Sequence, residues 1–147
     1  MELVENFING QYVSSDSSAF IDIYEPATGD IYGQFKDSNA NDIDHAVRSA
    51  KNAFPDWSGL SVRERAVHLN NIANGIEQRL DEFAEFESRD TGKPIALARS
   101  LDIPRSVLNF KFFADHAMQF EFNFNLNSES SQNLINRSPL GVVACIS

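Results

Sequence analysis

The densest group of chemically capable side chains is a short run around a forced turn, Asp90-Thr91-Gly92-Lys93-Pro94. It places a carboxylate, a hydroxyl and an ammonium group close together. In one interpretation Gly92 ends a helix, and the positive charge of Lys93 complements the negative end of the helix dipole. In the other, Asp90 is a ligand for a hard cation, which takes oxygen donors. The pattern favours the structural role and leaves the second one open.

The other residues able to do chemistry do not form a recognised site. His45, His68 and His116 are far apart and lack the spacing of a metal-binding pair, so each is expected on a helix surface. Cys145 lies in an apolar run with no base beside it, which favours a buried structural thiol over a nucleophile. The glycines form neither a dinucleotide-binding fingerprint nor a P-loop.

Residues 6–36 are predicted to form short strands. Asn9-Gly10, between apolar neighbours, predicts a tight hairpin because a type I′ turn needs two positive φ angles. Residues 20–24 alternate and predict a strand with Ile21 and Ile23 on one face. The run Pro26-Ala27-Thr28-Gly29 predicts a turn, after which the chain returns as a strand over residues 31–36.

Residues 41–118 are predicted to be helical, because apolar residues recur at helical spacing. We expect Pro55 to end the first helix and Trp57 to lie in the connector. Ser61 and Glu64 match a capping box at the start of the second helix. Candidate caps for the first helix are Ser38, Asn39 and Asn41.

Three more helices are predicted. Asp81 is a candidate cap for the third, Pro94 starts the fourth, and Asp102 is a candidate cap for the fifth. The fifth helix carries two apolar stripes: Ile103, Val107, Phe110 and Ala114 on one, and Leu108, Phe112 and Phe113 on the other. A helix that is apolar on two sides is buried between two surfaces, and the preceding helices can supply only one.

The last nine residues form a short apolar run introduced by Pro139 and Gly141. It predicts a strand that is apolar on both faces, as found inside a parallel sheet covered by helices. Such a strand needs neighbours on both edges, and no second run of this kind is present. We therefore expect these 147 residues to be the opening part of a longer protein.

Composition restricts the class of protein. The formal net charge is −9, which disfavours nucleic acid and anionic membrane as partners. A single cysteine excludes an internal disulfide framework and fits a reducing compartment. The first residues lack a signal-peptide pattern, and no apolar run approaches the ~20 residues that a membrane helix needs. A cytoplasmic protein is expected.

The order of the motifs resembles the N-terminal part of the aldehyde dehydrogenase superfamily. The resemblance covers essentially the whole chain and rests on five runs: Pro26-Ala27-Thr28-Gly29, Ala46-Val47, Ala53-Phe54-Pro55-Asp56-Trp57, Asp90-Thr91-Gly92-Lys93-Pro94 and Arg137-Ser138-Pro139-Leu140-Gly141-Val142-Val143. Residues 101–115 resemble the 2-hydroxymuconic and 2-aminomuconic semialdehyde dehydrogenases in particular.

The resemblance implies an incomplete α/β fold, the N-terminal part of an NAD-binding, Rossmann-like domain. Residues 1–119 would form β hairpins and a helical cluster. Residues 120–138, where phenylalanine alternates with polar residues, would form an extended oligomerisation arm. Residues 139–147 would be the first strand of the Rossmann-like sheet. The full-length parent would be a homodimer or homotetramer.

The resemblance also implies an activity for the full-length parent, the oxidation of a small-molecule aldehyde to a carboxylic acid with NAD, or NADP. In the family a cysteine attacks the aldehyde to form a thiohemiacetal, hydride passes to the nicotinamide, and a glutamate-activated water hydrolyses the thioester. Both catalytic residues lie downstream of the matched region, and Cys145 does not match the catalytic cysteine. We therefore expect no catalytic residue in this chain and no turnover from it.

Two sites carry over by resemblance. Ile146 and Ser147 match the strand end where the family's cofactor pocket begins. Ile23, Tyr24 and Asp90 match positions that bind a structural monovalent cation in some members, the first two largely through backbone oxygen. The family usually has asparagine where this chain has Glu25, which removes an amide able to hold the following turn.

Two alternatives remain. One is a natural short form that acts as a non-catalytic interaction module on full-length subunits. The other, an unrelated helical adaptor, is disfavoured by the order of the motifs.

Overall fold

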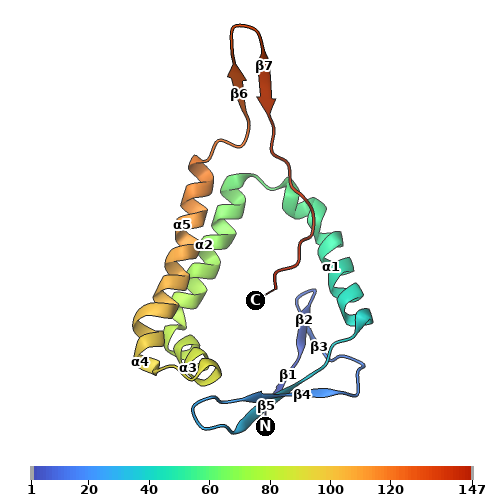
Figure 1. The fold of residues 1–147 in the computed structure, drawn as a ribbon, viewed down its shortest axis with the longest axis vertical. Helices are drawn as coiled ribbons and strands as arrows, with labels where there is room; N and C mark the ends of the chain where they lie inside the picture. The colour runs from blue at the N-terminus through green and yellow to red at the C-terminus, as the bar shows by residue number, and fades with distance from the viewer. Residues whose placement is uncertain (1, 147) are drawn as a thin grey trace.

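A computed structural model describes residues 2–146, in which strands and helices surround an open centre (Figure 1). The strands of the first part are β1 (Glu2–Val4), β2 (Asn6–Ile8), β3 (Gln11–Val13), β4 (Phe20–Tyr24) and β5 (Ile31–Lys36). The helices that follow are α1 (Ala40–Gly59), α2 (Val62–Gln78), α3 (Leu80–Thr91), α4 (Ile95–Leu97), the π-helical segment η1 (Ala98–Asp102) and α5 (Ile103–Gln119). The last strands are β6 (Phe124–Asn127) and β7 (Gln132–Ile135).

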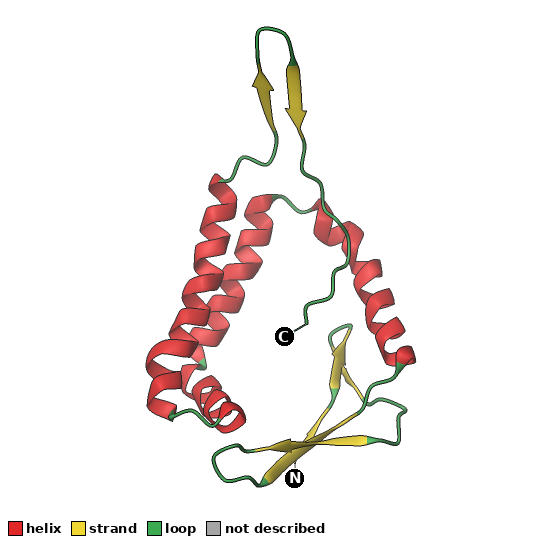
Figure 2. Ribbon diagram, in the orientation of Figure 1, coloured by secondary structure: helices red, strands yellow, loops and turns green. Residues whose placement is uncertain are grey.

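The strands form three small sheets. β5 lies between β1, to which it is parallel, and β4, to which it is antiparallel; the three-stranded order is β1-β5-β4. β2 and β3 form an antiparallel hairpin whose turn residues Asn9 and Gly10 have φ values of 54° and 75°, which confirms the predicted turn. β6 and β7 form a second hairpin, which projects beyond the ends of α2 and α5 (Figure 2). The strand β1 was not predicted, because its parallel partner lies far along the chain.

The turn between β4 and β5 forms as predicted. The carbonyl oxygen of Glu25 accepts hydrogen bonds from the amides of Thr28 and Gly29, at 3.2 Å and 2.8 Å. Gly29 has a φ of 80°, which a glycine adopts without steric cost. The amide of Asp30 also donates to Oγ1 of Thr28 at 3.2 Å. These bonds hold the turn without the asparagine amide that Glu25 replaces.

The prediction that Pro55 ends the first helix is wrong. α1 continues through Pro55 to Gly59, so Trp57 lies in the helix and not in a connector. A proline inside a helix removes one backbone hydrogen bond, but its fixed φ is compatible with helix and the following residues can continue the turn. No residue of α1 is fully buried, so the apolar face predicted for this helix is only partly covered by the described residues.

Two of the predicted caps are confirmed and two are wrong. Asn39 caps α1 and Ser61 caps α2, each in a capping box. Asp81 lies in the first turn of α3 and Arg79 precedes the helix, without a side-chain cap. Asp102 also makes no capping bond, because η1 continues directly into α5 and the backbone amides there already have helical partners.

The core lies where α2, α3 and α5 meet, and it is small. α2 and α5 lie side by side, and the buried stripe of α5 is the predicted one, with Ile103, Val107 and Ala114 inside. The buried apolar residues of the described chain are Ile8, Ala66, Ala73, Ala84, Ala98, Ile103, Val107 and Ala114. Most are alanines, and no large side chain among them is fully buried.

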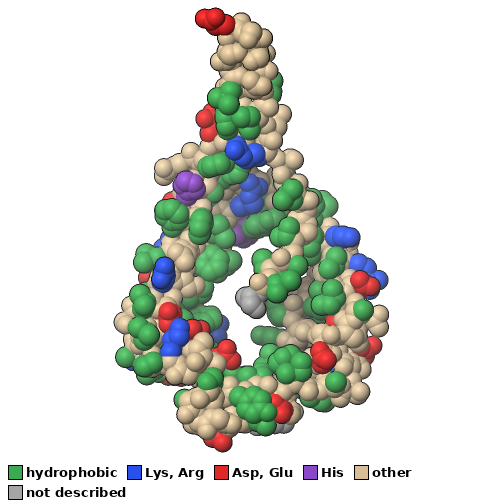
Figure 3. All heavy atoms as spheres, in the orientation of Figure 1, with side chains coloured by type: hydrophobic (Ala, Val, Ile, Leu, Met, Phe, Trp, Pro, Cys, Tyr) green, Lys and Arg blue, Asp and Glu red, His purple; other side chains and the backbone are tan. Residues whose placement is uncertain are grey.

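The molecule exposes far more surface than a compact domain of its size. Its accessible surface is 11063 Å² for a mass of 16.4 kDa. A folded monomer of that mass exposes about 7,500 Å². Figure 3 shows an opening through the centre, bordered by hydrophobic side chains of the helices and of the C-terminal segment. The second predicted stripe of α5, with Leu108, Phe112 and Phe113, is exposed.

The C-terminal segment runs from the hairpin into the opening (Figure 1). Residues 139–146 have no strand assignment, and in the described sheets nothing pairs with them. Leu140 and Ile146 are 96% and 95% exposed. The predicted strand is therefore not formed here, because a strand needs a partner. Cys145 is also exposed, so the prediction of a buried thiol is wrong for this structure.

The α/β composition, with small sheets and a helical cluster, is as predicted. In the part of the chain that the structure describes, no helix has the length and apolar character needed to cross a membrane.

Candidate functional site

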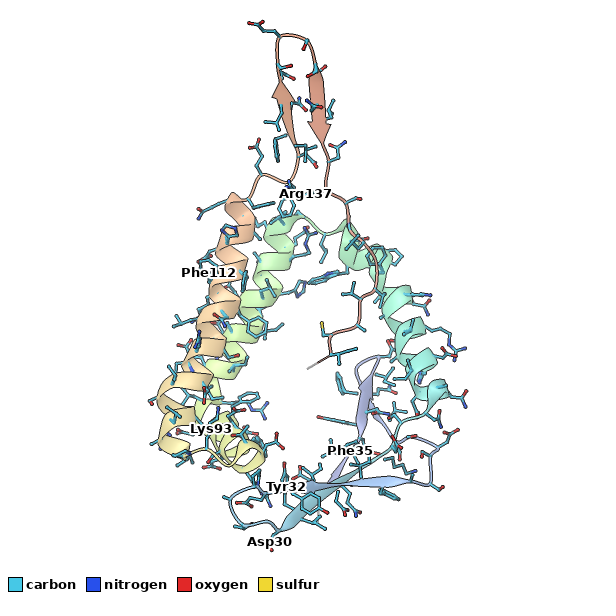
Figure 4. All side chains as sticks on the ribbon, in the orientation of Figure 1. Asp30, Tyr32, Phe35, Lys93, Phe112 and Arg137 are labelled. Atoms are coloured by element: carbon cyan, nitrogen blue, oxygen red, sulfur yellow. The ribbon has the colours of Figure 1, made fainter. Side chains whose placement is uncertain are left out.

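The structure joins the segment around Asp90 to the three-stranded sheet. The hydroxyl of Tyr32, on β5, donates a hydrogen bond to Oδ1 of Asp90 at 2.8 Å. Burial and this hydrogen bond raise the pKa of Tyr32 above its ordinary value. Figure 4 shows Tyr32 on the sheet, on the side that faces α3.

Arg89 makes a second contact across the same joint. Its guanidinium carbon lies 4.2 Å from the centre of the Tyr32 ring, and its Nε lies 3.4 Å from Oε2 of Glu25. Glu25 thus pairs with Arg89 in place of the turn contact that an asparagine would make. Both groups are partly exposed, so the ion pair adds little stability by itself. Its main effect is to orient Arg89 over the ring.

Gly92 brings the end of α3 close to the turn after β4. It follows α3 in the left-handed conformation, with φ 75°, which confirms its predicted role as a helix terminator. A Cβ atom built on Gly92 would lie 3.1 Å from Cβ of Pro26. Two motifs that are far apart in the sequence therefore pack against each other, and glycine is needed for both the conformation and the approach.

Lys93 links α3 to η1. Its Nζ lies 2.9 Å from Oε1 of Glu87 and 2.8 Å from Oδ2 of Asp102. The bonds to Asp102 and then Glu87 raise the pKa of Lys93, so the ammonium stays charged at neutral pH. Asp102, predicted as a cap, is instead an ion-pair partner. Lys93 thus has the structural role favoured by the sequence pattern, near the C-terminal end of α3 (Figure 4).

The residues expected to bind a monovalent cation lie at this joint. The β4–β5 ladder shifts register between Ile23 and Tyr24, and such a bulge leaves backbone groups outside the regular pairing. Asp90 contributes one carboxylate. Among the described residues no cluster of three or more His, Cys, Asp or Glu side chains could hold a metal. One carboxylate does not match the nitrogen and sulfur ligands that zinc takes.

The two residues expected at the cofactor pocket are not part of a formed site. Ile146 is almost fully exposed at the end of the C-terminal segment. Ser147 lies outside the described residues. Around Ile146 no described element forms a cavity of the kind that a dinucleotide needs.

Tyr32, Glu25 and Arg89 are the site residues that sequence patterns missed. Tyr32 looked like an ordinary strand residue, and Arg89 like a surface helix residue. Tyr32 and Asp90 are 58 residues apart in the sequence, and local sequence patterns cannot predict a contact between residues so far apart. The sequence singled out Glu25 only as the loss of an amide able to hold the turn, and its ion pair with Arg89 was not predicted.

The comparison with known proteins agrees with this arrangement of motifs. Residues 12–147 match the aldehyde dehydrogenase family. The chain belongs to that family. It is 42% identical over 146 residues to the human 2-aminomuconic semialdehyde dehydrogenase, covering 99% of this chain and 30% of that protein. It is 38% identical over 152 residues to the 2-hydroxymuconic semialdehyde dehydrogenase of Pseudomonas sp. strain CF600, covering 100% of this chain and 31% of that protein.

Solved structures of aldehyde dehydrogenases share the fold of this chain. The crystal structure of PnpE in complex with nicotinamide adenine dinucleotide matches with a TM-score of 0.84 and 34% identity, over 92% of this chain and 28% of that one. Lactaldehyde dehydrogenase from Escherichia coli matches with a TM-score of 0.80 and 28% identity, over 88% of this chain and 27% of that one. The chain thus spans about 30% of the length of the curated relatives that it matches.

Proposed function

We propose that this chain is the N-terminal part of an NAD-dependent aldehyde dehydrogenase that oxidises a muconic semialdehyde to the corresponding carboxylic acid. The proposal of substrate rests on the relatives named as 2-aminomuconic and 2-hydroxymuconic semialdehyde dehydrogenases, which match over nearly the whole chain. NADP remains an alternative cofactor, because no described residue is in a position to select between the two.

The observation that carries the proposal is the open centre bordered by hydrophobic side chains. Apolar surface of this kind is stabilised when other protein covers it. A parallel sheet built on the segment of residues 139–146 would lie there, between α1 on one side and α2 with α5 on the other. The exposed side chains of Leu140, Val143 and Ile146 would then become core residues of that sheet.

The chain's own contribution to the reaction is positioning. Its one cysteine, Cys145, is exposed on the C-terminal segment, and no base lies beside it in the sequence to activate it as a nucleophile. In the complete enzyme Ile146 and Ser147 would form one edge of the cofactor pocket. NAD would accept the hydride there, and the catalytic cysteine and glutamate would come from the downstream part.

A structural cation is proposed at the joint of Ile23, Tyr24 and Asp90. Thermal unfolding of the natural protein in potassium, sodium and tetramethylammonium chloride tests it. We expect a higher melting temperature with one of the two metal ions than with tetramethylammonium, and loss of this difference in Asp90→Ala. An equal melting temperature in all three salts would contradict the cation site.

The hairpin β6–β7 extends away from the helices, and no other strand in the described residues pairs with either of its outer edges. Such edges are suited to contact with another chain. We propose that residues 120–138 form an arm that joins subunits in a homodimer or homotetramer. The same feature favours the second candidate function, a natural short form that docks through this arm onto full-length subunits without catalysis of its own.

The sequence that follows Ser147 in the gene separates the two functions. In the resembled family the next residues after the matched region are Pro-Trp-Asn, so we expect this motif in the same reading frame. We also expect NAD-dependent oxidation of 2-aminomuconic or 2-hydroxymuconic semialdehyde by the polypeptide that contains it. A stop codon directly after Ser147 in the transcript would favour the short form. Activity with simple aldehydes but not with either semialdehyde would contradict the substrate and leave the family intact.

A further inference from the structure

Arg137 connects the two ends of the arm. It lies just after β7, at the base of the hairpin (Figure 4). Its backbone amide donates a hydrogen bond to Oδ1 of Asn123 at 3.0 Å, and its Nη1 donates one to the carbonyl oxygen of Phe122 at 3.2 Å. Both acceptors precede β6. A single residue therefore ties the chain that enters the hairpin to the chain that leaves it.

The guanidinium of Arg137 also lies against two aromatic rings. Its central carbon is 5.3 Å from the ring centre of Phe120 and 5.5 Å from that of Phe124. Phe120 and Phe122 are in edge-to-face contact, with their centres 5.0 Å apart. In the described part of the chain, no ion pair with a carboxylate includes Arg137. Rings and a carbonyl group hold this cation, which suits a planar guanidinium better than an ammonium.

The ring contacts continue from the arm into α5. Phe120 lies 5.9 Å from His116, and His116 stacks on Phe112 with the ring centres 5.8 Å apart and the planes 8° apart. Both His116 and Phe112 are on α5. Arg137 thus lies at one end of a row of rings that begins on the helix. Through these packed rings, the position of α5 can restrict the orientation of the hairpin.

The hairpin has little else to orient it. β6 and β7 pair only with each other among the described strands. An isolated two-stranded hairpin is at best marginally stable in water. Without the contacts of Arg137, the arm would keep its own pairing but lose a fixed direction at its base.

We propose that Arg137 is a positioning residue that closes the base of the arm and fixes its direction relative to α5, so that association with a second copy of the chain depends on it. The claim that subunit association depends on Arg137 rests on the proposed role of the arm. The claim that Arg137 closes the base of the arm does not rest on that role, because the contacts that close it lie within one chain.

The test compares three variants of the natural protein that contains this chain. Arg137→Met keeps the length of the side chain and removes the charge and the donors. Arg137→Lys keeps the charge and removes the planar group. Arg105→Met is the control, because Arg105 is an exposed arginine in the first turn of α5, at the end of that helix opposite the arm. Hydrogen exchange over residues 120–138 reports the base of the arm, and sedimentation against concentration gives the dissociation constant of the subunits.

We expect Arg137→Met to exchange faster at residues 120–125 and to weaken subunit association by about tenfold or more, which is the scale of losing one charged contact. Arg137→Lys should be intermediate, and Arg105→Met should match the unaltered protein. The melting temperature of the dissociated subunit should not change, which separates positioning from general stability.

Unchanged association in Arg137→Met would overturn the proposal. Unchanged hydrogen exchange at the base of the arm in Arg137→Met would also overturn it, whether or not the dissociation constant of the subunits changes. If the unaltered protein proves monomeric, the proposed role of the arm fails together with the dependence on association. The exchange result then still decides whether Arg137 closes the base.

Discussion

The hydroxyl of Tyr32 is hydrogen-bonded to the carboxylate of Asp90, and this contact helps to join the three-stranded sheet to the end of α3. The joint also includes Glu25, Arg89 and Gly92, which pack the turn after β4 against the helix end. The relative placement of sheet and helices therefore depends on a few polar contacts rather than on a shared apolar core.

Removing the Tyr32 hydroxyl tests this joint. We expect Tyr32→Phe to lower the free energy of unfolding of the natural protein by about 0.5–1.5 kcal/mol, the usual net value of one hydrogen bond. Denaturant unfolding measures it. Tyr24→Phe is the matched control, because Tyr24 is exposed and donates no described hydrogen bond. Equal loss in both variants would contradict a specific role for the Tyr32 contact.

The same tyrosine predicts an alkaline effect. Burial and the bond to Asp90 raise the pKa of Tyr32 in the folded state. Its stabilising effect is complete below the ordinary tyrosine pKa of about 10 and is lost as the pH rises through the raised value. We expect the stability difference between the unaltered protein and Tyr32→Phe to shrink above that pH. A difference that grows with pH would contradict the assignment.

Gly92 predicts a backbone effect that a second glycine controls. Gly92→Ala should destabilise the protein by about 1–2 kcal/mol, because alanine is strained at positive φ and its Cβ would press on Pro26. Gly75→Ala, inside α2 with open space around it, should be stabilising by about 0.5–1 kcal/mol. Melting temperatures of the two variants compare them directly. Similar shifts of the same sign would show that the approach to Pro26 is not tight.

Asp42 predicts an acid effect. The hydroxyl of Ser15 and then the amide of Asn39 donate to its carboxylate and hold the pKa of Asp42 below its usual value. The stabilising effect is therefore present above the usual aspartate pKa of about 4 and is lost as the pH falls through the lowered value. Asp42→Asn should lower stability at neutral pH and show less acid dependence. Denaturant unfolding at a series of acidic pH values measures this. The same loss of stability with falling pH in Asp42→Asn and in the unaltered protein would contradict it.

Local sequence patterns predicted the hairpin at Asn9 and Gly10, the caps at Asn39 and Ser61, and the end of α3 at Gly92, because each depends on residues within one turn. They failed at Pro55, where a breaking signal did not outweigh the helical residues on both sides. They also failed at Asp102, whose carboxylate pairs with Lys93 instead of capping. The contact of Tyr32 with Asp90 was beyond their reach, since only the tertiary fold brings the two together.

The strand predicted for residues 139–147 fails in this structure for a different reason. Its pattern of apolar residues is that of a buried strand, but the described chain offers it neither a paired neighbour nor a covering layer. An apolar pattern typical of a buried strand is compatible with the exposure of Leu140 and Ile146 if the neighbouring strands and the covering helices come from the part of the family's sequence that this chain does not match.

The most direct test is the formation of NADH by the purified 147-residue chain, incubated with NAD and 2-aminomuconic or 2-hydroxymuconic semialdehyde. The account predicts no NADH from this chain, because it assigns the nucleophile and the base to the downstream part of the proposed enzyme. NADH formation by the chain alone that disappears in Cys145→Ser would contradict it.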